Sequence, residues 1–535
     1  MGIMKKRTLA SVLCAMLAVS MLASCGSSSS SSSSTADSSA STTESADASE
    51  SESDADSEEA AADEDLRESE LVTLDVVTMS SGKNEPDISE VASAMNEILE
   101  PKFNVNVNLT FISYANYSEQ TSLMLSSGED ADLLAVYMIP LATCANAGQI
   151  IPLDDLIEQY GQGIKEQLGD YLECGRVGED LYGVTTARDL ANSQGFAYIK
   201  SVADEVGFDA SNISTLDDLK TELLKVKEAY PDMWPVAVSA GENIRNWGWD
   251  PLGDDTVNLG VLADMATDTT VVNLYETDQY KDLATTMYEW MQEGLIQADA
   301  VNTTETATTL MSAGTAFGYF TNLKPGYDEE NSSSLGYEIE SVEIIPALGC
   351  TNNVSRATWA ISSGCDHPEA AMKVLNELFT NSELSNLYMY GIEGTHYKVL
   401  EEGGASNGQD IITWADGVDA TTSNYRKSGT WLQPNQFIGD VWEGSAADVW
   451  DQQRDFNNNA QKSAAFGFTY DSANVTNEVT ACTNVVSKYN KALLCGALDP
   501  ETTLEQFNSE LYAAGLQNII DEKQSQLDAW LANQN

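Results

Sequence analysis

The sequence is nearly without histidine: only His367 and His396 occur among its 535 residues. Zinc and iron sites commonly use several imidazole ligands, often together with carboxylates. Two histidines argue against a His-rich zinc or iron centre, and against a triad of two histidines and one carboxylate. We therefore expect neither a metal ion nor a cofactor.

Positive charge is also scarce. The chain carries 26 Lys and Arg against 84 Asp and Glu, which gives a formal net charge of -58. A phosphate backbone would be repelled by that charge, so we expect no nucleic-acid partner. We interpret the acidic excess mainly as a solvated surface, because acidity alone does not indicate metal binding.

Closely spaced cysteines are missing as well. Of eight cysteines, Cys14 and Cys25 lie in the N-terminal segment, and the other six show no Cys-x-x-Cys spacing. An even number outside the cell permits disulfides, but their pairing cannot be deduced from one sequence. We favour buried free thiols, because a core of this size does not need cross-links. These six are Cys144, Cys174, Cys350, Cys365, Cys482 and Cys495.

The N-terminal segment has the pattern of a bacterial secretory signal. Three basic residues at positions 5–7 precede an apolar run at 9–22, which is too short to be interpreted first as a membrane-spanning helix. The run ends in Leu22-Ala23-Ser24-Cys25, which fits a lipobox, where the cysteine sulfur receives a diacylglyceryl group. We predict a lipoprotein signal over 1–25 with lipid on Cys25. An ordinary cleaved signal and a short uncleaved anchor are the alternatives.

Residues 26–70 are predicted to be a disordered tether. They begin with an unbroken serine run at 27–34 and contain Leu66 as the only large apolar residue and Arg67 as the only base. Such a segment cannot bury enough apolar surface to offset the entropy of ordering it. Repulsion between its acidic residues extends it, which favours a spacer.

The remaining chain is long enough for two domains, and its first part alternates strands and helices. Strands are predicted at 71–77, 105–111 and 131–139, with helices between them. This order implies a parallel sheet. In such sheets, ligands bind beyond the carboxyl ends of the strands. Tyr114 and Tyr137 lie at two such ends. Each could contact a ligand or could pack at the rim of the sheet, and the sequence leaves both interpretations open.

Several blocks resemble the extracellular solute-binding proteins, family 1, of ABC importers. Residues 123–133 are similar to a helix-to-strand signature of that family, and 149–156 to a following motif. Residues 178–184 resemble a hairpin before the first crossover between lobes, and 366–375 a helix opening. Together with residues 466–530, these blocks resemble a LipO-like lipoprotein subgroup that has an extra C-terminal domain of unknown function.

The resemblance implies an α/β, two-lobe, periplasmic-binding-protein-like fold of type II, with parallel-sheet lobes joined by a hinge and ligand bound between them. We predict lobe 1 from 71–190 and 355–420, and lobe 2 from 191–354 and 421–535. The implied partners are a small solute, ABC permease subunits with a separate ATPase, and the membrane through the lipid. The expected protein is a monomer on the outer face of a membrane, with a Gram-positive surface favoured.

A carbohydrate ligand, in particular an oligosaccharide, is favoured by aromatic and amide side chains in apparent loops. Aromatic rings stack on the C–H faces of sugars, and amides or charged groups bind the hydroxyls. Core packing is the alternative for each residue. Besides Tyr114 and Tyr137, the candidates are Arg188, Asn192, Trp247, Trp249, Tyr319, Asn322, Trp359 and Glu393.

Two other functions stay open. A peptide receptor or the binding subunit of a sensor would use the same fold. A surface glycoside hydrolase would need two carboxylates across the scissile bond, and this acidic chain offers too many to single out a pair. We predict a binding protein and not an enzyme.

Overall fold

The computed structural model describes 66–80, 85–128, 131–137, 139–238, 244, 246–253, 257–425 and 430–534. The predicted signal with Cys25, and the tether up to residue 65, lie outside the described residues. In the part of the chain that is described, no helix combines the length and apolarity that crossing a bilayer requires.

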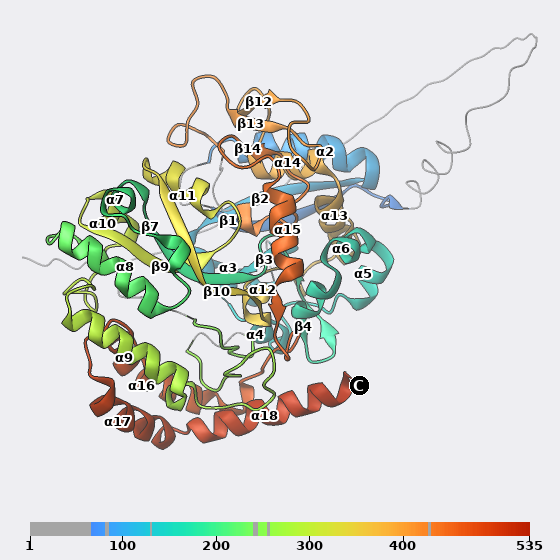
Figure 1. The fold of residues 1–535 in the computed structure, drawn as a ribbon. Coiled ribbons are helices and arrows are strands. Elements are labelled where there is room, and N and C mark those ends of the chain that lie inside the picture. Colours follow the sequence, from blue (N-terminus) through green and yellow to red (C-terminus); the bar gives the residue numbers. More distant parts are fainter. Residues whose placement is uncertain are drawn as a thin grey trace, which may run out of the picture. The chain divides into compact units, whose positions relative to one another are not determined.

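The first lobe is built on a five-stranded sheet of order β2-β1-β3-β11-β6 (Figure 1). The first three strands in sequence are parallel, as predicted, whereas β11 runs antiparallel to β3 and β6. The strands are β1 (Val72–Ser80), β2 (Val105–Ser113), β3 (Leu133–Tyr137), β6 (Val184–Thr185) and β11 (Ala357–Ile361).

Helix α2 of the first lobe buries one apolar face. In α2 the residues Val91, Met95 and Leu99 recur every four positions and are all buried. Pro368 opens α13, as predicted, because its missing N–H is not needed in a first turn. The helices are α2 (Ile88–Phe103), α3 (Tyr117–Ser127), α4 (Leu141–Asn146), α5 (Asp154–Tyr160), α6 (Gln162–Leu168), α13 (Pro368–Thr380) and α14 (Ser382–Tyr390).

The second lobe has a mixed sheet of order β15-β10-β7-β9-β8. Its central strand β7 is antiparallel to both neighbours, so this sheet is less parallel than predicted. The strands are β7 (Asn192–Ile199), β8 (Trp234–Val236), β9 (Ala316–Leu323), β10 (Ile339–Gly349) and β15 (Gln461–Lys462). Its helices are α7 (Lys200–Val206), α8 (Leu216–Ala229), α9 (Asp278–Gln292), α10 (Ala307–Ser312) and α11 (Tyr327–Leu335).

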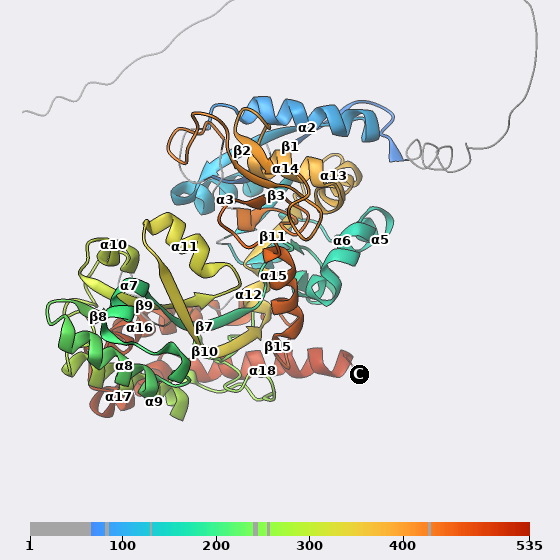
Figure 2. The ribbon, with the colours of Figure 1, turned by 45° about the horizontal axis from the view of Figure 1, so that its top comes forward.

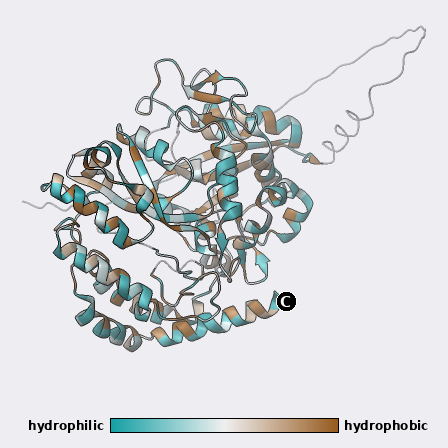
Figure 3. Cartoon of the chain, in the orientation of Figure 1, coloured by the Kyte–Doolittle hydropathy of each residue, from teal (hydrophilic) through white to brown (hydrophobic). Residues whose placement is uncertain are grey.

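Three C-terminal helices complete the second lobe: α16 (Thr476–Leu494), α17 (Pro500–Ala513) and α18 (Leu516–Asn533). Both α16 and α17 pack on α9, side by side in Figures 1 and 2. Apolar and hydrophilic residues alternate along these outer helices, as Figure 3 shows. Lys523 of α18 is fully buried, and its Nζ donates to the carbonyls of Pro251 and Gly260 at 2.9 Å each. The C-terminal region is therefore an integral part of the lobe 2 core.

Three segments of chain connect the lobes. The first joins β6 to β7, after the hairpin of β4 (Arg176–Val177) and β5 (Asp180–Leu181). The second joins β10 to β11 through α12 (Thr351–Ser355), and the third is α15 (Val449–Asn459).

Asn457 on the third segment bonds to the first. Its Oδ1 accepts from the N–H groups of Leu190 and Ala191 at 2.8 and 3.1 Å, and its Nδ2 donates to the carbonyl of Arg188 at 2.6 Å. The hydroxyl of Tyr171 donates to its backbone carbonyl at 2.7 Å. One buried amide thus fixes two of the three connections against each other.

The structure places two chain segments differently from the predicted boundaries. Tyr425, Leu432 and Phe437, expected in lobe 2, lie in the core of lobe 1, so the return to lobe 2 comes only after α15. Nearby lies a small sheet of β12 (Tyr397–Glu401), β13 (Ile411–Trp414) and β14 (Val441–Trp442). At the other boundary, Glu68 of the predicted tether is ion-paired with Lys373 of lobe 1 at 2.8 Å.

The six cysteines downstream of the N-terminal segment are all free thiols in this structure. Five are buried, and Cys365 is partly buried. Burial raises the pKa of the Cys365 thiol to about 12, and that of Cys482 and Cys495 to about 11. These thiols are therefore protonated at neutral pH, and the preference for buried free thiols is confirmed.

Asp440, beside β14, provides a prediction about pH. Burial, and then the negative charges of Asp410 and Glu393, raise the pKa of Asp440 from 3.8 to about 6. The folded protein then keeps a proton that the unfolded chain has already lost. The free energy of unfolding should therefore fall as the pH rises from 4 through 6, by about 2 kcal/mol after allowance for screening.

Urea unfolding of the Asp440→Asn variant at pH 4, 5, 6 and 7 measures this effect. The variant should lose most of that fall, whereas a Glu443→Gln control at an exposed position should keep it. Parallel pH profiles for wild type and Asp440→Asn would contradict the assignment.

Candidate functional site

An aromatic platform lies at the carboxyl end of the lobe 1 sheet, and we define it as Tyr114, Tyr137 and Trp431. Tyr114 directly follows β2 and Tyr137 ends β3, so the parallel strands deliver both rings to one edge. The ring centroids of Tyr114 and Tyr137 are 6.4 Å apart, and those of Tyr137 and Trp431 are 4.8 Å apart. Tyr114 is 51% exposed, so a ligand can reach its ring.

Two basic residues that act on Tyr137 of the platform lie in the segments that connect the lobes. Burial and the hydrogen-bonded hydroxyl of Tyr114 raise the pKa of Tyr137. The positive charges of Arg188 and Arg356 act on it in the opposite direction. Both guanidinium groups therefore lie close enough to Tyr137 to influence its hydroxyl. Arg188 belongs to the first connection between the lobes and Arg356 to the second.

A polar pocket of about 370 Å³ lies where these connections meet lobe 2. Its volume falls in the range of small-molecule sites in proteins. Side chains of the crossover segments form one wall, and β9 and α11 form the other. The lining residues are Arg188, Asp189, Asn192, Asn322, Leu323, Lys324, Tyr327, Glu330, Asn331, Asn353 and Arg356.

Charged side chains in the polar pocket are only partly compensated. Asp189 lies 3.5 Å from Nη1 of Arg188 and 3.9 Å from Nζ of Lys324, and Lys324 also pairs with Glu330 at 3.2 Å. Nε of Arg188 and Oδ1 of Asp189 are buried without a hydrogen-bond partner among the described residues. A buried polar group without a partner is costly unless another group binds it, so this wall is a candidate place for polar ligand atoms.

A pair of tyrosines supports the lobe 2 wall. The hydroxyls of Tyr319 and Tyr327 are 2.6 Å apart, and Tyr327 also donates to Thr321 at 3.3 Å. Burial raises the pKa of both hydroxyls, so they remain neutral donors and acceptors. Tyr319 stands behind the pocket wall and positions Tyr327, which lines the pocket.

The structure brings some of the predicted ligand residues together. Arg188, Asn192 and Asn322 line the polar pocket, and Tyr114 and Tyr137 form the platform near it. Their contact with a ligand stays a prediction.

Other predicted residues lie elsewhere. Trp249 is 1% exposed and donates to Oδ1 of Asn258 at 3.1 Å, and Trp247 packs edge-on against Phe320 in the lobe 2 core. Trp359 has no exposed surface, and its Nε1 donates to the carbonyl of Leu432 at 3.0 Å. Glu393 is exposed beside β12 and does not line the polar pocket.

Sequence reasoning missed the other residues of this region, among them Lys324, Tyr327, Arg356 and Trp431. Trp431 begins the loop 431–437, whose polar residue Asn435 is buried and donates to the carbonyl of Phe379 at 2.8 Å. An aromatic residue beside a polar loop was the available signal for Trp431. Nothing in the local sequence distinguishes Arg356 from other surface arginines.

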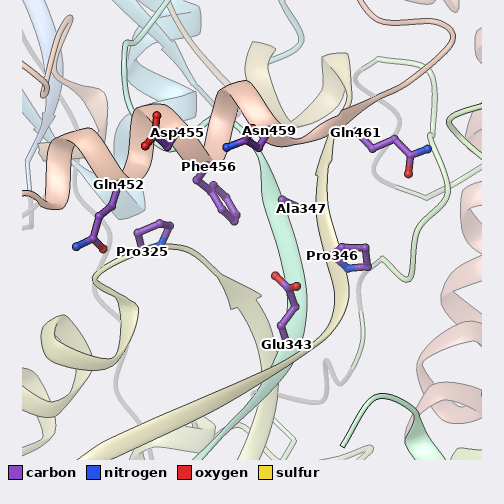
Figure 4. Close-up of a pocket in the computed structure, with 9 residues that line it drawn as sticks. All are labelled: Pro325, Glu343, Pro346, Ala347, Gln452, Asp455, Phe456, Asn459 and Gln461. Atoms are coloured by element: carbon purple, nitrogen blue, oxygen red, sulfur yellow. The ribbon is translucent and has the colours of Figure 1, made fainter. Parts of the chain in front are cut away.

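A second pocket, of about 490 Å³, lies between α15, β10 and the turn at Pro325. Figure 4 shows the ring of Phe456 projecting from α15 into this space, with Glu343 below it. None of the predicted ligand residues lines it. The polar pocket is the stronger candidate, because its lining residues Arg188 and Arg356 also act on Tyr137 of the platform.

Two side chains that would be considered for catalysis, Ser406 and His396, form other contacts in the structure. A Gly-x-Ser-x-Gly pattern occurs at 404–408, but Ser406 is exposed and bonded to Asp451. Both ring nitrogens of His396 are engaged, by Asp87 at 3.1 Å and by the N–H of Ile392 at 2.9 Å. The described parts of the chain contain no group of acidic, His or Cys side chains arranged to hold a metal ion.

Two lobes, three connecting segments and a polar pocket beside an aromatic platform define a hinged binding protein. The model for the bacterial extracellular solute-binding protein family matches residues 85–383, more than half of the chain, so the chain belongs to that family. This is a family of extracellular binding proteins and not an enzyme family. The model of a domain of unknown function, DUF3502, matches residues 464–532, which contain the C-terminal helices.

Known relatives match most of the chain. A carbohydrate ABC transporter substrate-binding protein of Streptococcus pneumoniae serotype 4 is 27% identical over 473 residues, covering 86% of this chain and 91% of that protein. The structure of the N-glycan transport solute binding protein NgtS from S. pneumoniae matches with a TM-score of 0.77, 24% identity, and coverage of 86% and 100%. An HMO-binding solute-binding protein from Bifidobacterium longum infantis matches with a TM-score of 0.57, 16% identity, and coverage of 86% and 99%.

Proposed function

We propose that this protein is the lipid-anchored, extracellular substrate-binding subunit of an ABC importer and captures an oligosaccharide between its lobes. The observation that carries the proposal is the aromatic platform beside the polar pocket, because sugars need apolar stacking faces and hydroxyl partners together. The pneumococcal relative serves carbohydrate transport and NgtS serves N-glycan transport, and both support the same ligand class.

Capture requires that the ligand contact both lobes better in a closed state than in an open one. The platform belongs to lobe 1, and Asn322 and Tyr327 belong to lobe 2, so one oligosaccharide bridging them would stabilise closure. The permease would then recognise the closed form, and a separate ATPase would supply the energy. Lipid on Cys25 would hold the protein, as a monomer, at the outer face of a Gram-positive membrane.

The alternative of a surface glycoside hydrolase receives less support. That reaction needs a pair of carboxylates on either side of a glycosidic bond. The two carboxylates of the polar pocket, Asp189 and Glu330, are each paired with a cation, an arrangement that suits binding of hydroxyls. We propose that bound glycan is released unchanged. A peptide receptor would retain the fold but not need the aromatic rings at the strand ends, whereas the binding subunit of a sugar sensor would use the same site.

Calorimetric titration of the purified protein against monosaccharides, oligosaccharides and peptides tests the proposal. We expect micromolar or tighter binding of at least one oligosaccharide, and full recovery of the intact glycan after prolonged incubation. A response to peptides with silence across all saccharides would reject the sugar assignment. Cleavage of the bound glycan would instead favour a hydrolase.

A further inference from the structure

Basic side chains gather in the polar pocket in a chain that has few of them. Three of the 26 basic residues, Arg188, Lys324 and Arg356, line it. Only two carboxylates line the same pocket, Asp189 and Glu330. Against a formal net charge of -58 for the whole chain, this local balance is reversed.

The two carboxylates neutralise mainly Lys324 and one edge of Arg188. Lys324 lies between them, at 3.9 Å from Asp189 and 3.2 Å from Glu330. Arg188 uses Nη1 on Asp189, at 2.8 Å from its carbonyl and 3.5 Å from its carboxylate. The Nε edge of Arg188 has no hydrogen-bond partner among the described residues, although it is buried.

Arg356 is the least compensated of the three cations. Its side chain is exposed on the pocket wall, and it forms no ion pair within the described part of the chain. The positive charges of Arg356 and Arg188 both act to lower the pKa of Tyr137 on the platform. Two guanidinium groups in the lining of the polar pocket therefore retain unused donors.

Guanidinium groups bind carboxylates and sulfates in a planar, charge-assisted geometry that hydroxyls cannot match. Neutral hydroxyls already have suitable partners here in the amides of Asn192, Asn322 and Asn353. An acidic glycan approaching this chain is repelled at long range, but salt screens that repulsion beyond about 10 Å, so local cations decide the binding.

We infer that the ligand is an acidic oligosaccharide, whose carboxylate or sulfate group binds between Arg356 and the Nε edge of Arg188. This inference rests on the proposed function and adds the charge of the substrate to it. The neighbouring sugar rings stack on the platform, and Asn322 of lobe 2 binds hydroxyls.

The test compares three oligosaccharides with the same backbone: a neutral one, one with a terminal hexuronic acid, and one with a sulfate ester. Calorimetry on the purified protein should give binding of one acidic form at least about tenfold tighter than the neutral form. Raising NaCl from about 50 to about 500 mM should weaken acidic binding severalfold and leave neutral binding nearly unchanged. The uronate and sulfate arms identify which anion fits.

The Arg356→Gln variant should reduce acidic binding to about the level of the neutral glycan and change neutral binding less than about threefold. An Arg67→Gln variant, at an exposed position of lobe 1, should change neither. Equal affinity for neutral and acidic forms, or equal loss of both in Arg356→Gln, would overturn the inference while leaving the sugar receptor intact. Binding of no saccharide at all would instead overturn the proposed function, and the inference with it.

Discussion

Replacing Trp431 with alanine should weaken oligosaccharide binding about 30-fold, because the substitution removes an aromatic anchor of the site. The indole packs edge-on against Tyr137 at 4.8 Å and is partly buried, so truncation removes one ring of the platform and loosens another. Aromatic residues at the centre of a binding site typically contribute about 2 kcal/mol, which corresponds to that loss. Titration of wild type and variant with the same oligosaccharide measures the change.

Two further variants make the result specific to the platform. Trp431→Phe retains an apolar ring and should recover most of the affinity. Trp414→Ala removes a partly buried tryptophan of lobe 1 that packs against Trp442 in the small sheet and should leave binding unchanged. Unaltered affinity in Trp431→Ala would place the ligand away from the platform.

The Asn457→Ala variant should lower the free energy of unfolding by about 3 kcal/mol. The substitution leaves the N–H groups of Leu190 and Ala191 and the carbonyl of Arg188 without their partner in a buried place. Each unsatisfied group costs about 1 kcal/mol or more. Urea unfolding followed by circular dichroism measures the loss, and glycan affinity should fall as well, because Arg188 loses its backbone support.

The neighbouring residue on α15 supplies the matched control. Asn458 is exposed, so Asn458→Ala removes the same kind of side chain from the same helix without removing any of the hydrogen bonds of Asn457. Its stability should lie within about 0.5 kcal/mol of wild type. If both variants unfold at the same urea concentration, Asn457 does not fix the connecting segments.

Local periodicity predicts the elements of the first lobe well. The alternation at 105–111 and the spacing of Val91, Met95 and Leu99 each identify a buried face, and those elements form as expected. The same patterns do not indicate whether a buried face will pack in the core of lobe 1 or in that of lobe 2. The predicted boundary therefore puts Tyr425, Leu432 and Phe437 in lobe 2, although the chain stays on lobe 1 until α15.

Site residues are predictable only where topology brings them together. The rule that parallel strands present ligands at their carboxyl ends identifies Tyr114 and Tyr137 as neighbours. Trp247 and Trp249 lie in a segment that looks like a polar loop, but contacts with Phe320 and Asn258 bury them. Arg356 and Lys324 line one pocket because the second connecting segment converges with the turn between β9 and α11, and no local sequence pattern records that convergence.

The free thiols of the two lobes bear on how the folded protein tolerates its surroundings. No covalent cross-link joins distant parts of the described chain, so a reductant has no bond there to break. Oxidants that act through thiolates find little to attack, because the buried sulfur atoms keep their protons. The described parts of the two lobes therefore rely on non-covalent contacts, and their hinge motion should proceed alike in anoxic and aerated environments.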